Sequence, residues 1–246
     1  MVNASRRERL RAAQVAEQKR RRVRIFAAIG VGVGALVAIA VMVWSSFGAA
    51  GRVADRPPNA TAAGDGIVVN PGKAKPNAPV VGLYFDYQCP HCVTFEEKYG
   101  RTLNVLANSG DIQLVNHTKV FLDKGNAEGL SHKAASAAVC SDVAGVYKAY
   151  HQSIFAAAYS GQYTEELFRV ALPERVGLTG DKLTQFQACY DTKKMAGFVQ
   201  SVEDAASKAG VNSTPTLMIN GKNQDLTKLP DDVNQLKAFI DAAAKG

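Results

Sequence analysis

Residues 80–92 have the sequence VVGLYFDYQCPHC, and this stretch decides the fold. The run from Val80 to Tyr87 is rich in apolar, β-branched and aromatic side chains, which is typical of a buried strand. A helix is predicted from Pro90, because proline is favoured in the first helical turn. Cys89 and Cys92 therefore lie where a strand leads into a helix. The unpaired amides of a helix start favour thiolate over thiol, so Cys89 is a candidate nucleophile.

A βαβ unit is predicted around this junction. Apolar residues recur at helical spacing after Pro90, and Asn108-Ser109-Gly110 is expected to end that helix. The stretch from Ile112 to Leu122 is β-rich and predicts the next strand, while Ile67-Val68-Val69 predicts a short strand before the unit. The first turn of the unit holds the two cysteines.

Residues 127–208 have almost no strand signal and show repeated helical spacing, with breaks expected at Pro173 and at residues 177–180. Residues 215–221 then predict a strand and a turn, and Pro230 opens a final helix. The sequence therefore predicts an α/β core made of residues 67–126 and 209–246, with a helical insertion at 127–208.

The N-terminal part of the chain has a different composition. Residues 1–24 carry eight Arg and one Lys against two Glu, and residues 25–48 contain no charge. About 20 apolar residues suffice to span a membrane, so we expect a basic cytoplasmic tail at 1–24, a single transmembrane anchor at 25–48 and a linker at 49–66. Cleavage after Gly48-Ala49-Ala50 is the alternative, because small residues there resemble a signal peptidase site.

This topology predicts a cell-membrane protein whose folded domain lies outside the cytoplasm. The net charge of residues 1–24 is +7, which equals the formal net charge of the whole chain. The remaining residues are balanced, so the basic pI gives no support for nucleic-acid binding.

An oxidising compartment permits disulfides, and the chain has four cysteines. Three pairings are possible. Pairing Cys89 with Cys92 leaves Cys140 with Cys189, and this arrangement needs no interlocking loops. A zinc site that uses all four is the alternative, although structural zinc sites usually present two closely spaced pairs.

The dipeptide Thr214-Pro215 begins a predicted strand, where proline is tolerated only at an edge or a special bend. A cis proline at this position would leave a backbone edge open beside the sulfur, able to pair with an extended peptide.

With these motifs, the chain from about Ile67 onward resembles the DsbA-like thiol:disulfide oxidoreductases, which have a thioredoxin-like fold with a helical insertion. The motifs are Asp86 and its neighbours, Cys89-Pro90-His91-Cys92, the helical segment and Ser213-Thr214-Pro215-Thr216. The Pro-His dipeptide is typical of strongly oxidising members. Membrane-anchored actinobacterial members are also similar in having a second cysteine pair in the insertion, which implies a structural disulfide between Cys140 and Cys189.

The resemblance implies a disulfide-donating cycle in which Cys89 reacts with a substrate thiolate and His91 tunes its pKa. Reduced, unfolded exported proteins would be the substrates. No flavin or quinone signature is present in this sequence, and no bound cofactor is expected. A separate DsbB-like or vitamin K epoxide reductase-like membrane protein would reoxidise the enzyme, which is expected to be a monomer. One departure concerns the buried acid six residues before the first cysteine, because that position is Leu83 and the nearest acid is Asp86.

The sequence therefore predicts an extracytoplasmic thiol:disulfide oxidase. A reductase or isomerase of the same fold is one alternative. A copper chaperone that uses Cys89 and Cys92 as soft ligands is another.

Overall fold

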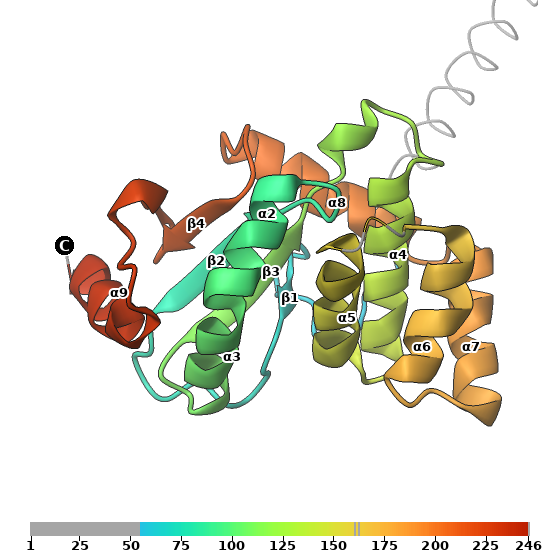
Figure 1. Ribbon diagram of the computed structural model, residues 1–246, viewed down its shortest axis with the longest axis horizontal. Helices are drawn as coiled ribbons and strands as arrows, with labels where there is room; N and C mark the ends of the chain where they lie inside the picture. The colour runs from blue at the N-terminus through green and yellow to red at the C-terminus, as the bar shows by residue number, and fades with distance from the viewer. Residues whose placement is uncertain (1–54, 160, 162, 246) are drawn as a thin grey trace, which may run out of the picture. The chain divides into compact units, whose positions relative to one another are not determined.

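The computed structural model describes residues 55–159, 161 and 163–245. In this part of the chain, one mixed sheet has the strand order β1-β3-β2-β4-β5 (Figure 1). Its strands are β1 (Ile67–Val68), β2 (Val80–Phe85), β3 (Gln113–Thr118), β4 (Thr216–Ile219) and β5 (Lys222–Asn223). β2 and β3 are parallel, and each of the other pairs is antiparallel.

The central strand β2 is buried on both faces of the sheet. Leu83 and Phe85 belong to the main apolar core. Tyr84, which points to the opposite face because side chains alternate along a strand, packs with Ala206 and Val211. This double burial explains why β2 is apolar along nearly its whole length.

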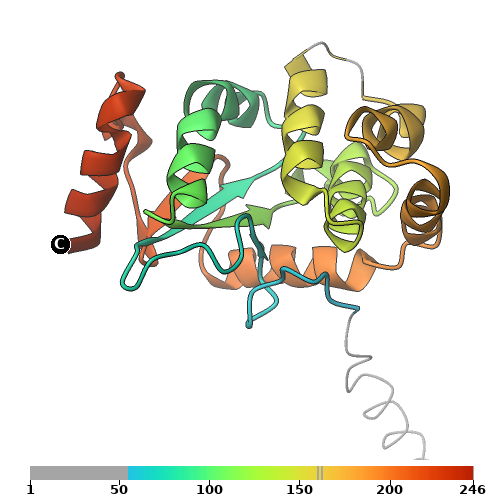
Figure 2. The ribbon, with the colours of Figure 1, turned by 90° about the horizontal axis from the view of Figure 1, so that it is seen from below.

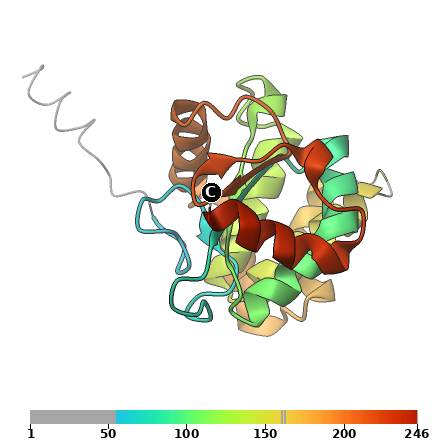
Figure 3. The same ribbon diagram turned by 90° about the vertical axis from the view of Figure 1, so that its left-hand side faces the viewer.

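Helices cover both faces of this sheet. α2 (Pro90–Phe95), the π-helical turn η1 (Glu96–Gly100) and α3 (Arg101–Asn108) form one helical stretch on one face. α8 (Ala196–Lys208) lies on the opposite face (Figure 2). α9 (Leu236–Lys245) packs against β4, as seen from the side in Figure 3.

The helical segment between β3 and β4 packs around one central helix, α4 (Leu130–Val143). Four alanines of α4 are fully buried, and their small side chains allow other helices to pack closely against it: Ala134, Ala135, Ala137 and Ala138. These neighbours include α5 (Tyr147–Tyr159), α7 (Gly180–Asp191) and α8. The segment between α5 and α7 contains the π-helical turn η3 (Leu167–Ala171) and α6 (Leu172–Arg175).

The β-rich stretch predicted to reach Leu122 ends earlier than expected. β3 stops at Thr118, and a 3₁₀ turn, η2 (Phe121–Asp123), follows. The reason lies in Glu203 of α8, which accepts hydrogen bonds from the Lys119 Nζ (2.7 Å) and from the Val120 backbone amide (2.8 Å). These bonds draw the chain away from the sheet.

Pro173 does not interrupt the helical segment as predicted. Residues 165–175 are helical throughout, with the π turn η3 directly before α6. Proline lacks the amide that would pair with the Phe168 carbonyl five residues earlier. The hydroxyl of Tyr150 donates to that carbonyl instead, at 2.5 Å.

The predicted anchor at 25–48 and the basic tail lie outside the described residues. No helix in the part of the chain that the structure describes is long and apolar enough to cross a membrane. Of the predicted linker, residues 55–66 are described. They pack against the domain through Asn59, which donates from its backbone amide and its Nδ2 to the Asp142 carboxylate at 2.9 and 2.7 Å.

Candidate active site

Cys89 is the residue that caps the N-terminus of α2, with an extended backbone (φ −78°, ψ 116°) and Pro90 directly after it. Its carbonyl accepts hydrogen bonds from the amides of Cys92 (3.0 Å) and Val93 (3.2 Å). The backbone amides of His91 and Cys92 also act on the Cys89 side chain and lower its pKa, as expected at a helix start.

The second part of the site comes from the opposite end of the sequence. β4 pairs antiparallel with β2, and Thr216 lies opposite Tyr84. This pairing brings the residues just before β4 beside the end of β2. The Thr214–Pro215 peptide bond is cis, and the Thr214 carbonyl oxygen lies 3.4 Å from the Cys89 Sγ.

The pKa values of the two thiols are shifted in opposite directions. Both cysteines are free and almost fully buried, with 6% and 2% of their surfaces exposed. The pKa of Cys89 is lowered to about 5, first by a hydrogen bond from Cys92 and then by the Thr214 side chain and the amides of Cys92 and His91. The pKa of Cys92 is raised well above its usual value, first by its hydrogen bond to Cys89 and then by burial. At neutral pH the pair therefore holds one thiolate, on Cys89, with Cys92 as its proton donor.

The other predicted site residues surround this pair. Pro90 and His91 are exposed, and Thr214 and Pro215 are half-buried. A hollow of about 350 Å³ opens beside the pair, lined by His91, Thr94, Phe95, Lys98, Tyr99, Thr214, Pro215 and Leu226. The His91 backbone amide is one of the groups that lower the Cys89 pKa.

Cys140 and Cys189 lie apart from this site. They form a disulfide that joins α4 to α7, with Cα atoms 5.9 Å apart. Because both sulfurs are bonded to each other, the alternative of a zinc site with all four cysteines does not apply. Among the described residues, no group of three or more His, Cys, Asp or Glu side chains is placed to hold a metal ion.

The acid nearest to the pair in the sequence is Asp86, which is completely buried. Its carboxylate accepts hydrogen bonds from the Gln88 amide (2.9 Å), the Leu122 amide (3.3 Å) and the Ser131 hydroxyl (2.6 Å). Burial raises its pKa to about 6 despite these bonds. Leu83, at the position where an acid was expected from the resemblance, is part of the apolar core.

Comparison with known proteins places the chain in a family. The model of the family described as thioredoxin matches residues 72–242, which is more than half of the chain. The chain belongs to the thioredoxin family. No curated protein matches its sequence.

Solved structures show which thioredoxin-family fold this is. The MdbA thiol-disulfide oxidoreductase from Actinomyces oris is 21% identical, with a TM-score of 0.63 over 76% of this chain and 91% of that one. MdbA from Corynebacterium diphtheriae is 20% identical, with a TM-score of 0.60 over 77% and 94%. Reduced DsbA from Mycobacterium tuberculosis is 23% identical, with a TM-score of 0.56 over 74% and 98%. The fold is therefore DsbA-like, as the sequence motifs indicated.

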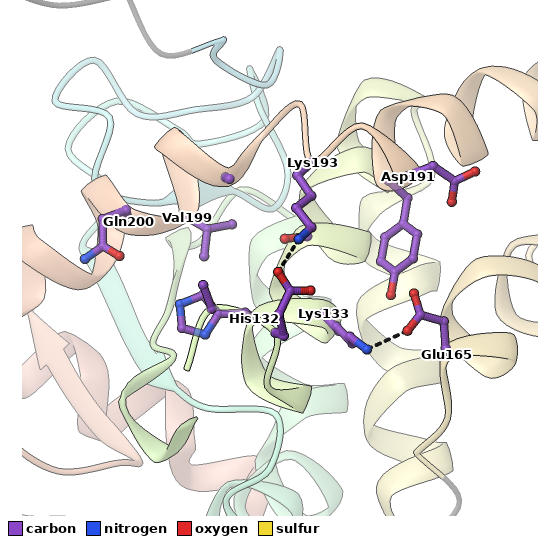
Figure 4. A pocket seen from close by; sticks show the side chains of 12 residues that line it. His132, Lys133, Glu165, Asp191, Lys193, Val199 and Gln200 are labelled. Atoms are coloured by element: carbon purple, nitrogen blue, oxygen red, sulfur yellow. Dashed lines mark hydrogen bonds and ion pairs between the residues drawn. The ribbon is translucent and has the colours of Figure 1, made fainter. Parts of the chain in front are cut away.

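This thioredoxin-family chain has a further hollow, of about 310 Å³, in its helical segment (Figure 4). Ion pairs between Lys193 and Glu128 and between Lys133 and Glu165 lie along it. His132, from the first turn of α4, lies on its wall. The sequence did not predict this hollow, because its lining residues come from separate helices.

Sequence reasoning also missed Gln88, Asp123 and Ser131, which surround Asp86. Only Gln88 lies next to a motif. The other two lie more than 30 residues downstream, so no local pattern connects them to the cysteines.

Proposed function

We propose that this protein is an extracytoplasmic thiol:disulfide oxidase, which donates a disulfide between Cys89 and Cys92 to newly exported proteins. The observation that carries the proposal is the opposite acidity of the two thiols. A stable thiolate on Cys89 favours the reduced enzyme, and an enzyme that favours its reduced form gives its disulfide away. The named function of the similar solved structures supports the same activity.

The proposed reaction has two exchange steps. A substrate thiolate attacks the Cys89 sulfur of the oxidised enzyme, and the Cys92 sulfur leaves and takes up a proton. The second substrate thiolate then attacks the substrate sulfur of this mixed disulfide, and Cys89 leaves as a thiolate. The substrate gains one disulfide, and the enzyme gains two electrons as a dithiol.

The size of the effect follows from the pKa of Cys89. A change from 9.0 to about 5 stabilises the reduced form at pH 7 by about 2.7 kcal/mol, since one pKa unit corresponds to 1.36 kcal/mol and two units lie between 5 and 7. For a two-electron couple this is about 60 mV toward a more oxidising potential. Thiolate stabilisation alone therefore covers somewhat less than half of the interval of about 150 mV between the potentials of thioredoxin and DsbA.

Substrate access fits this chemistry. The hollow beside the cysteines is lined by Phe95, Tyr99 and Leu226 as well as by Pro215. Apolar and aromatic walls suit an unfolded polypeptide, whose apolar side chains are exposed. We propose that such a segment lies beside Cys89 during the exchange.

The proposal extends to location and partner. The uncharged stretch 25–48 and its basic flank support a single-pass cell-membrane anchor with a cytoplasmic N-terminus. The enzyme would act as a monomer, and a quinone-linked membrane protein of DsbB or vitamin K epoxide reductase type would reoxidise it. Labelling of Cys89 in intact cells with a membrane-impermeant thiol reagent tests this orientation.

The decisive experiment is the equilibrium of the Cys89–Cys92 pair with glutathione, combined with oxidation of a reduced, unfolded protein. We expect a potential well above the value of about −270 mV that is typical of thioredoxin. A potential near that value would support the reductase alternative instead. Tight one-to-one Cu(I) binding without substrate oxidation would support the copper chaperone.

A further inference from the structure

A closed ring of hydrogen bonds lies behind the turn that carries Cys89. The Asp86 Oδ1 accepts from the Gln88 amide at 2.9 Å and from the Ser131 hydroxyl at 2.6 Å. The Gln88 Nε2 donates to that same hydroxyl oxygen at 2.7 Å. The ring therefore joins the residue before Cys89 to the first turn of α4, 43 residues away.

A second carboxylate, Asp123, reinforces the ring. Its side chain is 3% exposed. Its Oδ1 accepts from the Gln88 Nε2 at 2.7 Å and from the Ser131 amide at 3.2 Å. Its Oδ2 lies 2.8 Å from both the amide and the Nδ1 of His132. One carboxylate thus holds Gln88 and also caps the free amides at the start of α4.

The local backbone is shaped for this contact. Gly129, the residue before α4, provides no side-chain cap, and a Cβ at that position would lie 2.1 Å from the Asp123 Cγ. Only glycine therefore leaves room for the carboxylate. The outer end of the network, His132, reaches the hollow of Figure 4.

We propose that Asp86 and Asp123 are positioning residues for Cys89. These two carboxylates act through Gln88 and Ser131 to hold the turn of residues 86–89, here called the redox turn, against α4. The inference rests on the proposed function only in taking Cys89 as the reacting thiol. The Cys89 amide donates to the Asp86 carbonyl at 2.9 Å, so the ring and the thiol share one turn. With the ring intact, the Cys89 sulfur stays beside the Thr214 carbonyl and the helix amides.

The sign of the change in the Cys89 pKa distinguishes a positioning role of the carboxylates from a purely electrostatic one. A nearby carboxylate disfavours a thiolate, so removal of its charge alone would lower the Cys89 pKa. Loss of positioning has the opposite effect, because hydrogen bonds to the thiolate weaken as the turn shifts. Variants that cut the ring, or that remove the Asp123 carboxylate bound to it, therefore raise the pKa of Cys89 if the proposal is correct.

The test uses Gln88→Ala, Asp123→Ala and the double variant of the full chain. The Cys89 pKa is measured in the reduced protein from thiolate absorbance near 240 nm. We expect each single variant to raise it by about one unit, a tenfold weaker thiolate preference. The double variant should shift the pKa by less than the sum of the two single shifts, because Asp123 acts on the turn partly through Gln88 and partly through Ser131. Gln88 is half-buried, so we expect its truncation to leave the fold intact even where Asp123→Ala does not fold.

Asp142→Ala is the matched control. Asp142 is also buried and on α4, and it also accepts two hydrogen bonds, but from Asn59 rather than from the redox turn. It should lower the melting temperature and leave the Cys89 pKa unchanged. An unchanged or lower Cys89 pKa in Gln88→Ala, or an equal rise in Asp142→Ala, would overturn the inference. Failure of the proposed function gives a separate result, since the wild-type protein would then not oxidise reduced substrate whatever the pKa values are.

Discussion

The two cysteine pairs of this protein are equally buried and chemically different. Cys89 and Cys189 are each 6% exposed, while Cys92 and Cys140 are 2% and 1% exposed. Yet the first pair holds free thiols at a helix start, and the second is a disulfide between two helices. Burial therefore does not decide which pair is reactive. The hydrogen-bond donors around the Cys89 sulfur do.

The largest expected effect comes from removing the reacting sulfur. Cys89→Ser should abolish oxidation of a reduced, unfolded protein, because a serine oxygen cannot form the mixed disulfide. Substrate oxidation is followed by loss of free thiols. Activity close to that of the wild type would show that the two pairs have been assigned the wrong roles.

Removing the second pair should change stability rather than chemistry. The double variant Cys140→Ser/Cys189→Ser opens a loop with a sequence separation of 49 residues, which the chain-entropy model values at about 4 kcal/mol. Urea unfolding measures the loss, and the Cys89 pKa should stay near 5. A large shift of that pKa would mean that the two pairs are coupled.

The pH dependence of stability gives the next largest effect. The folded pKa of Cys89 is lowered from 9.0 to about 5, so its contribution to the reduced form is complete above pH 9 and is lost as the pH falls through 5. Between pH 4 and pH 7 the stability of the reduced form should therefore rise by about 2.7 kcal/mol relative to that of the oxidised form, whose disulfide contributes a term that does not depend on pH. Unfolding of both forms from pH 4 to pH 8 measures the difference. Asp86 also has a raised pKa, but it is present in both forms, so its contribution cancels from the difference in stability between them.

A smaller effect is expected at Thr214. Its side chain lowers the pKa of both thiols although its buried Oγ1 makes no hydrogen bond of normal geometry, so Thr214→Val should raise the Cys89 pKa by at most about one unit and move the midpoint of the alkylation pH profile up by the same amount. Valine has nearly the same shape, which limits the change to the lost hydroxyl. Iodoacetamide kinetics across pH give the shift, and an unchanged profile would remove the hydroxyl from the explanation.

The smallest effect concerns His91. Its backbone amide is among the groups that lower the Cys89 pKa, and this amide is kept when the side chain is substituted. We therefore expect His91→Ser to raise the Cys89 pKa by less than Thr214→Val does. A larger shift would restore the imidazole as the main tuning group, as the sequence motif suggested.

The sequence predicted the parts of this protein that depend on local patterns. The strand predicted at residues 80–87 is present at Val80–Phe85, two residues shorter, and the helix from Pro90 and the break at Gly110, whose φ is 75°, lie where apolar spacing, proline preference and glycine predicted them. The contact between Cys89 and Thr214 was inferable because both lie in recognisable motifs.

Other features depend on contacts that no local pattern records. β3 ends early because Glu203, far along the chain, binds Lys119 and Val120. The helix continues through Pro173 because Tyr150 satisfies a carbonyl that proline leaves free. The contacts of Asp123 could not be predicted from a local pattern either, because they join Gln88 to the start of α4, which is distant in the sequence.

The strap formed by residues 55–68 has a mechanical consequence. It is fastened to the domain by the two hydrogen bonds from Asn59 to Asp142 and by the pairing of β1 with β3. A pull on the chain from its N-terminal side would load α4 and the β1 edge of the sheet first. β2 and the turn that carries Cys89 make no pairing with residues 55–68, so tension would reach them only through β3 and through the hydrogen bonds that join the turn to α4.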